Sequence, residues 1–373
     1  MKIIFNDNGL RALINFRIDV IEHFVADGHQ VVLIYPTCTR EEDLISKIPQ
    51  RCKVYEVNMF PSSNNPLKDF SYFCQLYKIY KKEKPDIVFN YTIKPNIYGS
   101  LAAKLVRIKR VDMVAGLGYI FTGNGLSKKI GRLLYKIGLR VADRVITLNM
   151  DNRNLLIERG FVLRKNMILY GGGEGVNLSH YPYVKNEFNV TRFLMVARVL
   201  YDKGYQEYVD AAEIVKKQYP NVDIELLGPL DETSPMGVPK SVVEQDVKAN
   251  KIKYLGVTND VPSYLKRDGV VVVVVSSYHE GLNRSLMEAC AMARPVITTN
   301  IAGCKETVEQ GINGYIVIPK DKQSLAEAMI RFIELPQKEK QEMAENSYRK
   351  AVQCFDVNIV LKKYDNIISE LIP

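Results

Sequence analysis

The stretch GVVVVVVSSYHEGLNRSLMEACA occupies residues 269–291 and joins two different patterns. Its six consecutive valines, Val270–Val275, predict a strand that is buried on both faces, as in a parallel sheet. From about Asn283 onward the pattern is helical, so the stretch predicts a strand, a short loop and a helix. Glu280 and Glu288 lie eight positions apart in the loop and helix. The question is whether these carboxylates bind a ligand or only cap the helix.

Apolar runs alternate with helix-period segments on both sides of this stretch. Continuous apolar strands joined by helices are typical of a parallel sheet covered on both faces. Two successive blocks of similar size therefore predict an α/β fold with two Rossmann-like, doubly wound domains. The expected strands are 2–5, 31–35, 53–57, 86–91, 111–116, 143–149, 191–198, 223–228, 252–256, 270–275, 295–300 and 314–319. The expected helices include 14–26, 69–82, 97–107 and 127–141.

An irregular stretch, YGGGEGVNLSHYPYVKNEF at 170–188, separates the two blocks. Its four glycines indicate a hinge, so we expect domains at 1–177 and 178–354. Ligands of doubly wound sheets bind outside the carboxyl ends of the strands, so we expect the domains to face each other across a shared cleft. The last segment, 355–373, carries an apolar helical stripe that must be buried on its own domain or back across the hinge. The stripe comprises Val357, Val360, Leu361, Tyr364, Ile367, Ile368 and Leu371.

The composition is that of an ordinary globular protein, with 47% hydrophobic and 25% charged residues among 373. No apolar run reaches the ~20 residues that a membrane span needs. The opening residues, MKIIFNDNGL, resemble a core strand and not a targeting signal, so we expect a cytoplasmic protein. Six scattered cysteines without a CxxC pair favour free or buried thiols over zinc sites or disulfides.

The net charge of +9 belongs entirely to the first half of the chain. Residues 1–177 carry 27 Lys and Arg against 16 Asp and Glu, whereas the remainder carries 24 against 26. A basic amphipathic helix at 127–141 can lie on an anionic membrane surface, but a solvated helix that covers the sheet fits equally well. Basic motifs interleaved with aromatic residues are missing, so no nucleic-acid partner is expected. The cations of this helix are Lys128, Lys129, Arg132, Lys136 and Arg140.

Polar residues follow two expected strands of the second half at their carboxyl ends. Arg198 and Lys203 there suit a phosphate clamp, although an isolated pair of this kind is more often solvated. Glu280 precedes a helix whose first amides favour a diphosphate. Because a carboxylate accepts from vicinal diols, Glu288 suits a ribose and Glu280 a hexose. The alternatives are a helix-dipole role for Glu280 and a surface position for Glu288, and spacing alone does not establish a glycosidase pair.

Several motifs are missing from the chain. There is no GxGxxG, Walker A or HExxH sequence. Without an Asp-x-Asp pair, a metal-clamped nucleotide diphosphate lacks its usual ligands, and the four histidines are scattered. We therefore expect no metal and no cofactor. Near the amino end, Gly9 lies between an expected strand and a helix, where a glycine lets the backbone approach a phosphate.

These elements together resemble the retaining glycosyltransferases of family 4, which have the two-domain GT-B fold. The matching stretches are VARVLYDKGY (196–205), SSYHEGLNRSLMEACAMARPVITTNIAGCKETVEQGINGYIV (276–317) and the hinge sequence GEGVNL. KPNIYGSLAAKLVRI (94–108) and GLGYIFTG (116–123) are similar to the subgroup that extends capsule, O-antigen and protein-glycan precursors in bacteria. The resemblance spans nearly the whole chain.

The resemblance implies a role for each matching residue. Arg198 and Lys203 would stabilise the donor diphosphate and the charge that develops on it. Glu280 would bind the donor-sugar hydroxyls, and Glu288 the ribose diol. Further donor contacts would come from the backbone of Gly9, Gly281, Leu282 and Asn283. In this family the configuration of the transferred carbon is retained, no metal is needed, and the last helix usually crosses back to the first domain.

The chain departs from the family pattern at two positions. Many relatives carry a histidine immediately before the glycine that is Gly116 here, where this chain has Ala115, and Asn283 replaces the usual proline. Both departures leave the identity of the donor sugar open. The resemblance also places three residues on the acceptor side, namely Lys94, Asn96 and Thr122.

The expected function is transfer of a hexose or N-acetylhexosamine from a UDP-sugar to an undecaprenyl diphosphate-linked saccharide, in bacterial surface polysaccharide or glycan biosynthesis. The basic first domain would sit peripherally on the inner face of the cytoplasmic membrane. A UDP-sugar epimerase of the same architecture is an alternative, which would lack Arg198 and Lys203 in this register. A nucleotide-sugar-binding pseudoenzyme is the non-enzyme alternative, and the intact set of charged residues argues against it.

Overall fold

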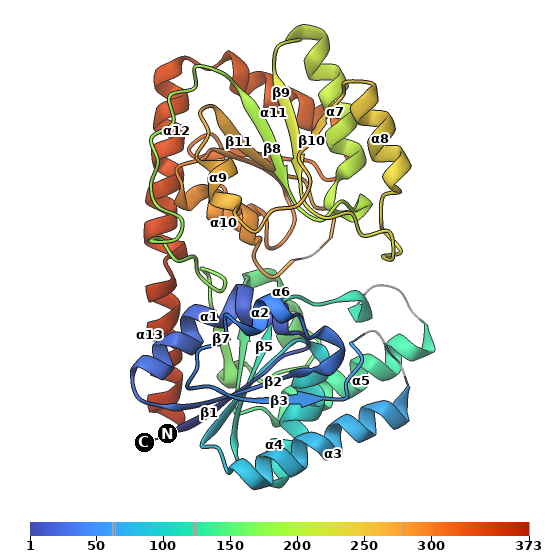
Figure 1. Cartoon of the computed structure of the whole chain (residues 1–373), viewed down its shortest axis with the longest axis vertical. Helices are drawn as coiled ribbons and strands as arrows, with labels where there is room; N and C mark the ends of the chain where they lie inside the picture. The colour runs from blue at the N-terminus through green and yellow to red at the C-terminus, as the bar shows by residue number, and fades with distance from the viewer. Residues whose placement is uncertain (62, 64, 122–124, 279, 373) are drawn as a thin grey trace. The chain divides into compact units, whose positions relative to one another are not determined.

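The computed structural model describes residues 1–61, 63, 65–121, 125–278 and 280–372 (Figure 1). The chain forms two units, of which the first comprises Met1–Glu174 with Asn358–Pro373 and the second Gly175–Val357. Each unit contains one parallel sheet covered by helices. The prediction of two doubly wound α/β domains is therefore confirmed.

Unit 1 is built on a seven-stranded parallel sheet in the order β3-β2-β1-β4-β5-β6-β7. The order reverses between β1 and β4, as in other doubly wound sheets. The strands are β1 (Lys2–Asn6), β2 (Gln30–Pro36), β3 (Lys53–Val57), β4 (Ile87–Tyr91), β5 (Lys109–Val114), β6 (Arg144–Thr147) and β7 (Met167–Leu169). The helices are α1 (Leu10–Ala26), α2 (Glu42–Ile45), α3 (Pro66–Glu83), α4 (Ser100–Leu105), α5 (Leu126–Val141), α6 (Met150–Glu158) and α13 (Val357–Leu371).

The strands predicted for the first half are all present, with small shifts at their ends. The prediction missed β7, a half-buried strand of three residues at the edge of the sheet, because so short a run has no readable periodicity. The helices predicted at 14–26, 69–82 and 127–141 correspond to α1, α3 and α5. The fourth begins as a π-helical turn at Pro95–Gly99 and continues as α4.

Helix α13 is grouped with unit 1 from Asn358 onward, and most of its apolar stripe is buried. Tyr364 lies at the centre of this contact. Its hydroxyl lies 2.9 Å from that of Tyr91, and its ring packs edge-on against Phe89 with the centroids 5.1 Å apart. Of the predicted stripe, only Leu361 is half-buried. The last helix is thus part of the core of unit 1.

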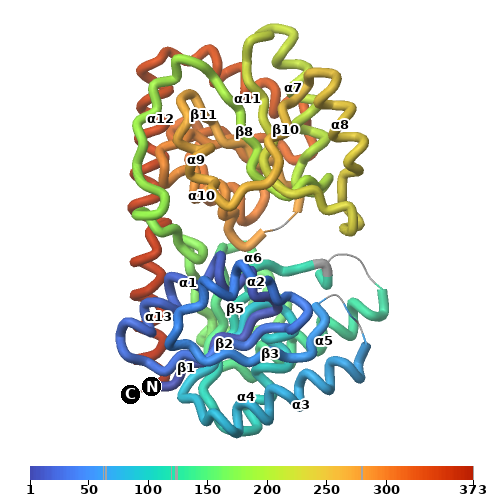
Figure 2. Tube along the Cα trace, in the orientation of Figure 1, coloured from blue at the N-terminus to red at the C-terminus, as the bar shows by residue number. Residues whose placement is uncertain are grey.

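Unit 2 is built on a six-stranded parallel sheet in the order β10-β9-β8-β11-β12-β13. Figure 2 labels β8, β10 and β11 of this sheet along the Cα trace. The strands are β8 (Arg192–Val196), β9 (Asp223–Leu227), β10 (Lys253–Tyr254), β11 (Val270–Val274), β12 (Val296–Thr299) and β13 (Gly314–Val317). The helices are α7 (Tyr205–Gln218), α8 (Lys240–Lys248), α9 (Val261–Leu265), α10 (Arg284–Ala291), α11 (Lys322–Glu334) and α12 (Gln337–Lys350). All six strands predicted for this half are present.

The valine strand β11 lies at the centre of this sheet, between β8 and β12. Its five valines are fully buried, because the neighbouring strands and the helices on both faces cover them. The predicted buried strand is therefore confirmed. Since β11 is central and parallel to its neighbours, the loop that leaves it emerges at the carboxyl edge of the sheet, where doubly wound folds bind ligands.

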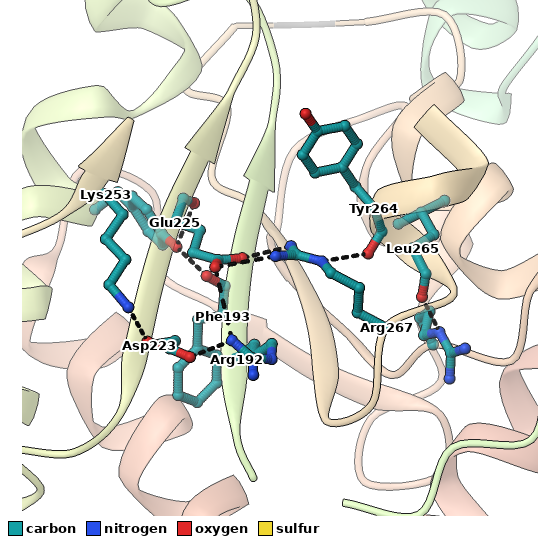
Figure 3. A network of polar contacts seen from close by, with 10 residues as sticks. Arg192, Phe193, Asp223, Glu225, Lys253, Tyr264, Leu265 and Arg267 are labelled. Atoms are coloured by element: carbon teal, nitrogen blue, oxygen red, sulfur yellow. Dashed lines mark hydrogen bonds and ion pairs between the residues drawn. The ribbon is translucent and has the colours of Figure 1, made fainter. Parts of the chain in front are cut away.

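Ion pairs connect neighbouring strands of the same sheet near their amino-terminal ends (Figure 3). The buried carboxylate of Glu225 on β9 accepts two hydrogen bonds from the guanidinium of Arg267, at 3.1 and 2.5 Å. Asp223, at the start of β9, pairs with Arg192 on β8 and with Lys253 on β10. A bidentate arginine satisfies both oxygens of a buried carboxylate, so these contacts are structural. They are distinct from the loops at the carboxyl edge.

Candidate functional site

Backbone contacts with two neighbouring segments hold the loop that follows β11. The Ser277 amide donates to the Asp202 carbonyl at 2.9 Å, and the Glu280 amide donates to the Ala302 carbonyl at 3.1 Å. Gly303 lies against this loop with φ +88°, and a Cβ atom there would come within 2.8 Å of the Glu280 carbonyl. Glycine is therefore required at this position, and the backbone of Glu280 is fixed.

Lys203 and Glu280 form an ion pair at this edge, although they are 77 positions apart in the sequence. Lys203 Nζ donates to Glu280 Oε1 at 2.9 Å, and the two side chains are 18% and 14% exposed. The next residue, Gly204, adopts φ +85°, and a Cβ atom there would lie 2.4 Å from the Val275 carbonyl oxygen. This close turn against the end of β11 brings the ammonium group to the carboxylate.

Asn283 caps α10 and connects the helix to Glu280. Its Oδ1 accepts from the Leu286 amide at 3.1 Å, as an N-cap side chain does, and its Nδ2 donates to Glu280 Oε2 at 3.0 Å. The Asn283 amide itself donates to the Gly303 carbonyl at 2.6 Å. The prediction that this amide assists donor binding needs correction, because the amide already has an acceptor.

Glu288 is buried in α10 at 8% exposure, so the alternative of an ordinary surface residue is wrong. Arg284, one helical turn earlier, donates from Nε to Glu288 Oε1 at 2.8 Å. The same guanidinium donates from Nη1 to the Gly175 carbonyl at 2.9 Å. Within the described residues, Oε2 of Glu288 has no hydrogen bond, so it can accept from a ligand hydroxyl.

Arg198 follows β8 as predicted, but it takes a different partner. Its Nη1 lies 3.1 Å from Asp231 Oδ2, and its side chain is 56% exposed. The structure therefore brings Lys203 to Glu280 without bringing Arg198 into the same ion pair. A guanidinium this exposed is held weakly by its partner, since surface ion pairs contribute about 0–1 kcal/mol, and can turn to an anionic ligand.

Gly9, Lys94 and Asn96 of unit 1 lie in three different environments. Gly9 is extended, with φ −170°, and a Cβ atom there would meet nothing closer than 3.9 Å, so the fold itself does not demand glycine. Lys94 Nζ donates to the Phe60 and Ser63 carbonyls and to Asp69, and so fastens a loop to α3.

Asn96 is fully buried and donates to the Met113 carbonyl at 2.9 Å and to the Tyr135 hydroxyl at 3.2 Å. Its side chain has no surface to offer an acceptor, so the acceptor-side prediction for Asn96 does not fit the structure. Thr122 lies outside the described residues. Gly281 and Leu282 are buried in the loop between Glu280 and α10, and their contribution to donor binding stays a prediction.

Sequence reasoning missed four residues that shape this site. They are Asp231, Arg284, Gly303 and Cys304. An arginine four positions before a glutamate on a helix signals an i,i+4 pair, so Arg284 could have been found from the sequence. The other three come from distant segments, and no local pattern marks them.

Cys304 lies beside the ion pair, with Sγ 4.0 Å from Glu280 Oε1. Burial, with a further contribution from Glu280, raises the pKa of this thiol well above its usual range. A thiol that stays protonated is a poor nucleophile, so covalent chemistry at Cys304 is not favoured.

Among the described residues, one group could hold a metal ion, and it consists of His23, Asp27 and Asp365 in unit 1.

We call Lys203, Glu280, Asn283, Arg284 and Glu288 the α10 cluster. It combines a mostly buried ammonium group, two carboxylates and the N-terminus of a helix. An ammonium group and a helix N-terminus both favour the negative charge of a phosphate. The carboxylates accept hydrogen bonds from hydroxyl groups. This set of groups suits a ligand that carries both phosphates and sugar hydroxyls.

Two protein-family models match the chain. One, described as glycosyl transferase 4-like, matches residues 12–149, and the other, described as glycosyl transferases group 1, matches residues 185–350. The second range contains the whole α10 cluster. The two matched ranges fall in different units of the structure.

The proteins that are similar to this chain in sequence include two named sugar transferases. It is 26% identical, over 100% of both chains, to the N,N'-diacetylbacillosaminyl-diphospho-undecaprenol alpha-1,3-N-acetylgalactosaminyltransferase of Campylobacter jejuni. It is 25% identical to the UDP-Gal:alpha-D-GlcNAc-diphosphoundecaprenol alpha-1,3-galactosyltransferase of Escherichia coli, over 81% of this chain and 79% of that protein.

Solved structures match the fold over almost the entire chain. Anabaena Alr3699/HepE in complex with UDP has a TM-score of 0.80 at 18% identity, covering 99% of this chain and 100% of that chain. A glycosyltransferase from Rickettsia africae has a TM-score of 0.79 at 21% identity, covering 99% and 98%. These matches confirm the predicted two-domain GT-B fold.

Proposed function

The chain carries the 4-like and group 1 glycosyltransferase domains, and on that premise we propose that it transfers a hexose or N-acetylhexosamine from a UDP-sugar to an undecaprenyl diphosphate-linked saccharide with retention of configuration. Such a reaction serves the synthesis of bacterial surface polysaccharides or glycans. The names of the Campylobacter and Escherichia enzymes support the acceptor class, and the UDP bound to the Anabaena structure supports the nucleotide. Within this chain, the observation that carries the proposal is the Lys203–Glu280 pair beside the start of α10.

In this proposal the charged groups of the α10 cluster have different tasks. Lys203 neutralises the charge that builds up on the leaving diphosphate as the bond to the sugar breaks, and Arg198 turns from Asp231 to assist it. Glu280, fixed by Lys203 and Asn283, accepts from hydroxyls of the donor sugar. Glu288 accepts from the ribose diol through Oε2. The acceptor hydroxyl then attacks from the face that the diphosphate leaves and passes its proton to the departing diphosphate oxygen, so the configuration is retained.

A direct assay separates this proposal from its alternatives. The protein is incubated with a panel of UDP- and GDP-sugars, with and without lipid-linked acceptors extracted from bacterial membranes. A transferase releases nucleotide and yields a heavier lipid-linked glycan only when the acceptor is present. An epimerase would convert the UDP-sugar without acceptor, and a pseudoenzyme would bind UDP without turnover, so either of those results contradicts the proposal.

Removal of divalent metal is expected to leave turnover nearly unchanged. The proposal assigns the neutralisation of the diphosphate to Lys203, Arg198 and the N-terminus of α10, which are part of the chain. The measurement compares initial rates with and without EDTA, with added Mg²⁺ as the control. A rate that falls with EDTA and returns with Mg²⁺ or Mn²⁺ would show that the reaction depends on a metal ion.

Helix α5 presents two apolar faces, only one of which is buried in unit 1. On the buried face, a Cβ atom at Gly138 would lie 2.7 Å from the Asn96 carbonyl oxygen, so the helix packs closely there. On the other face, residues at i, i+4, i+7 and i+11 form an exposed stripe, which comprises Leu126, Ile130, Leu133 and Ile137. Exposed Lys129 and Arg140 belong to the same helix.

We propose that this stripe docks unit 1 on an anionic membrane surface, where the lipid-linked acceptor resides. Apolar side chains on a basic amphipathic helix enter the headgroup region, and the cations attract anionic lipids. A solvated helix gains nothing from an exposed apolar stripe, which favours the membrane over the alternative. None of the described helices is long and apolar enough to cross a bilayer.

The double substitution Leu133→Asp and Ile137→Asp is expected to abolish binding to vesicles that contain phosphatidylglycerol. Both side chains are exposed, at 59% and 41%, so the fold is expected to tolerate the change. Sedimentation with vesicles measures binding, and that of the unmodified protein is expected to weaken as salt rises. Leu163→Asp, at an equally exposed leucine outside α5, is the matched control. Vesicle binding by the double variant that equals that of the control would contradict the docking proposal.

A further inference from the structure

The chain passes from unit 1 to unit 2 between Glu174 and Gly175, and an arginine holds each of these two residues. The Glu174 carboxylate pairs with Arg17, whose side chain is 3% exposed inside unit 1. The Gly175 carbonyl accepts from Arg284 Nη1 at 2.9 Å inside unit 2. Consecutive linker residues are thus held by two different guanidinium groups.

The linker at 174–176 is also tied to the point where the chain returns to unit 1. The Val176 amide donates to the Phe355 carbonyl at 2.6 Å, and the Val357 amide donates to the Val176 carbonyl at 3.1 Å. Gly175 adopts φ +78°, and a Cβ atom there would lie 2.7 Å from the Val357 Cα. The linker is therefore a packed and hydrogen-bonded segment in which glycine is obligatory.

Arg284 connects this linker to the carboxylate that we assign to the ribose. Its Nε donates to Glu288 Oε1 at 2.8 Å while its Nη1 donates to Gly175. A guanidinium is a rigid planar fork, so one end cannot change direction without moving the other. A diol that binds Glu288 alters the position and charge of that carboxylate, and Arg284 passes the change to the Gly175 carbonyl.

We propose that Arg284 is a positioning residue that couples occupancy of Glu288 by the ribose diol to the order of the linker at 174–176. The coupling rests on the proposed function for the ribose assignment, whereas the contacts of Arg284 are independent of it. Coupling between two sites is reciprocal, so a loosened linker must also weaken the binding of the nucleoside.

The first experiment uses the protein without ligand. Hydrogen–deuterium exchange of peptides that cover 170–178 is compared for the unmodified protein, Arg284→Met and Arg349→Met. Arg349 forms an exposed i,i+4 pair with Glu345 on α12 and is the matched control. Faster linker exchange in Arg284→Met than in the control supports the proposal, and equal exchange overturns it. Arg284→Lys, which keeps the charge but lacks the fork, is expected to lie between them.

The second experiment adds uridine, UDP or inorganic pyrophosphate. Uridine and UDP are expected to change linker exchange in the unmodified protein, whereas pyrophosphate is not, because only the first two carry the diol. In Arg284→Met the response to UDP is expected to vanish and the Kd for UDP to rise by about 5- to 150-fold, the usual range of such coupling. An undiminished linker response in Arg284→Met, or a response to pyrophosphate alone, overturns the proposal. If the protein does not bind UDP, the proposed function is wrong. The linker exchange measured without ligand would still show whether Arg284 orders the linker.

Discussion

Replacing Lys203 with alanine is expected to lower kcat by about 10²- to 10³-fold, which is the loss typical of removing one preorganised electrostatic group from a transition state. The reason lies in the geometry, because the Lys203 side chain is 18% exposed and its Nζ lies 2.9 Å from Glu280 Oε1. A positive charge in a site shielded from water stabilises the negative charge that develops on the diphosphate far more than a solvated charge does. Since the charge develops only as the bond breaks, kcat is expected to fall more than KM rises.

The design needs a control for the loss of a lysine and its ion pair. Lys322→Ala serves, because Lys322 pairs with Asp210 at 3.2 Å in the same unit and is 58% exposed. Glu280→Gln tests the partner, since it keeps the shape but removes the charge that holds Lys203. Thermal unfolding by circular dichroism checks that each variant is folded. Full activity in a folded Lys203→Ala variant would show that the α10 cluster is not the reaction centre.

The fold could be predicted almost completely from the sequence, and the reason is periodicity. Parallel strands buried on both faces appear as unbroken apolar runs, and Val270–Val275 is the clearest of them. Such runs fix which segments are strands even where their ends shift. β7 was missed because three half-buried residues carry too little of that signal. The grouping of the last helix with unit 1 was left open by its apolar stripe, since a stripe shows that a face is buried but not by what.

The site could be predicted only in part, because its contacts join distant segments. Strand ends pointed correctly to the positions of Lys203 and Glu280, since parallel strands bring their carboxyl ends to one edge. The position of a strand end does not predict which carboxylate a cation pairs with, and Arg198 pairs with Asp231 and not with Glu280. Asn96 was misplaced for a different reason. A polar side chain near a strand end can satisfy its hydrogen bonds inside the core, as this one does with Met113 and Tyr135.

The buried ion cluster around Arg17 had no sequence signal at all, and its disruption is the second large effect that we expect. Arg17→Met is expected to destabilise unit 1 by about 3–5 kcal/mol, the usual cost of leaving buried charges without their partner. The guanidinium pairs with Glu174, lies 3.8 Å from Asp7 and stacks on the ring of Tyr91 at 4.2 Å. Without Arg17, the carboxylates of Glu174 and Asp7 would lose their partner, although their side chains are only 11% and 0% exposed.

The matched control is Arg11→Met, because Arg11 lies on the same helix and forms an exposed ion pair with Glu41. Exposed pairs contribute about 0–1 kcal/mol, so the control is expected to change the thermal midpoint little. Both midpoints are measured by circular dichroism, with hydrogen exchange of β1 peptides to locate the effect in unit 1. Equal midpoints for the two variants would contradict a structural role for the Arg17 cluster.

The pH dependence of the Arg17 effect identifies which carboxylate is responsible. Burial raises the pKa of Asp7 from 3.8 to about 7, while Arg17 lowers it and so opposes that shift. A raised carboxyl pKa means that the folded state holds the proton more tightly, so the contribution of Asp7 to stability is present below about pH 4 and is lost as the pH rises through 7.

Without Arg17 the pKa of Asp7 rises further, because the one opposing cation is gone. The destabilisation caused by Arg17→Met is therefore expected to be smaller at pH 5, where Asp7 is protonated, and to grow toward pH 8. In the variant Asp7→Asn this growth is expected to disappear, and its persistence there would assign the pH dependence to another group.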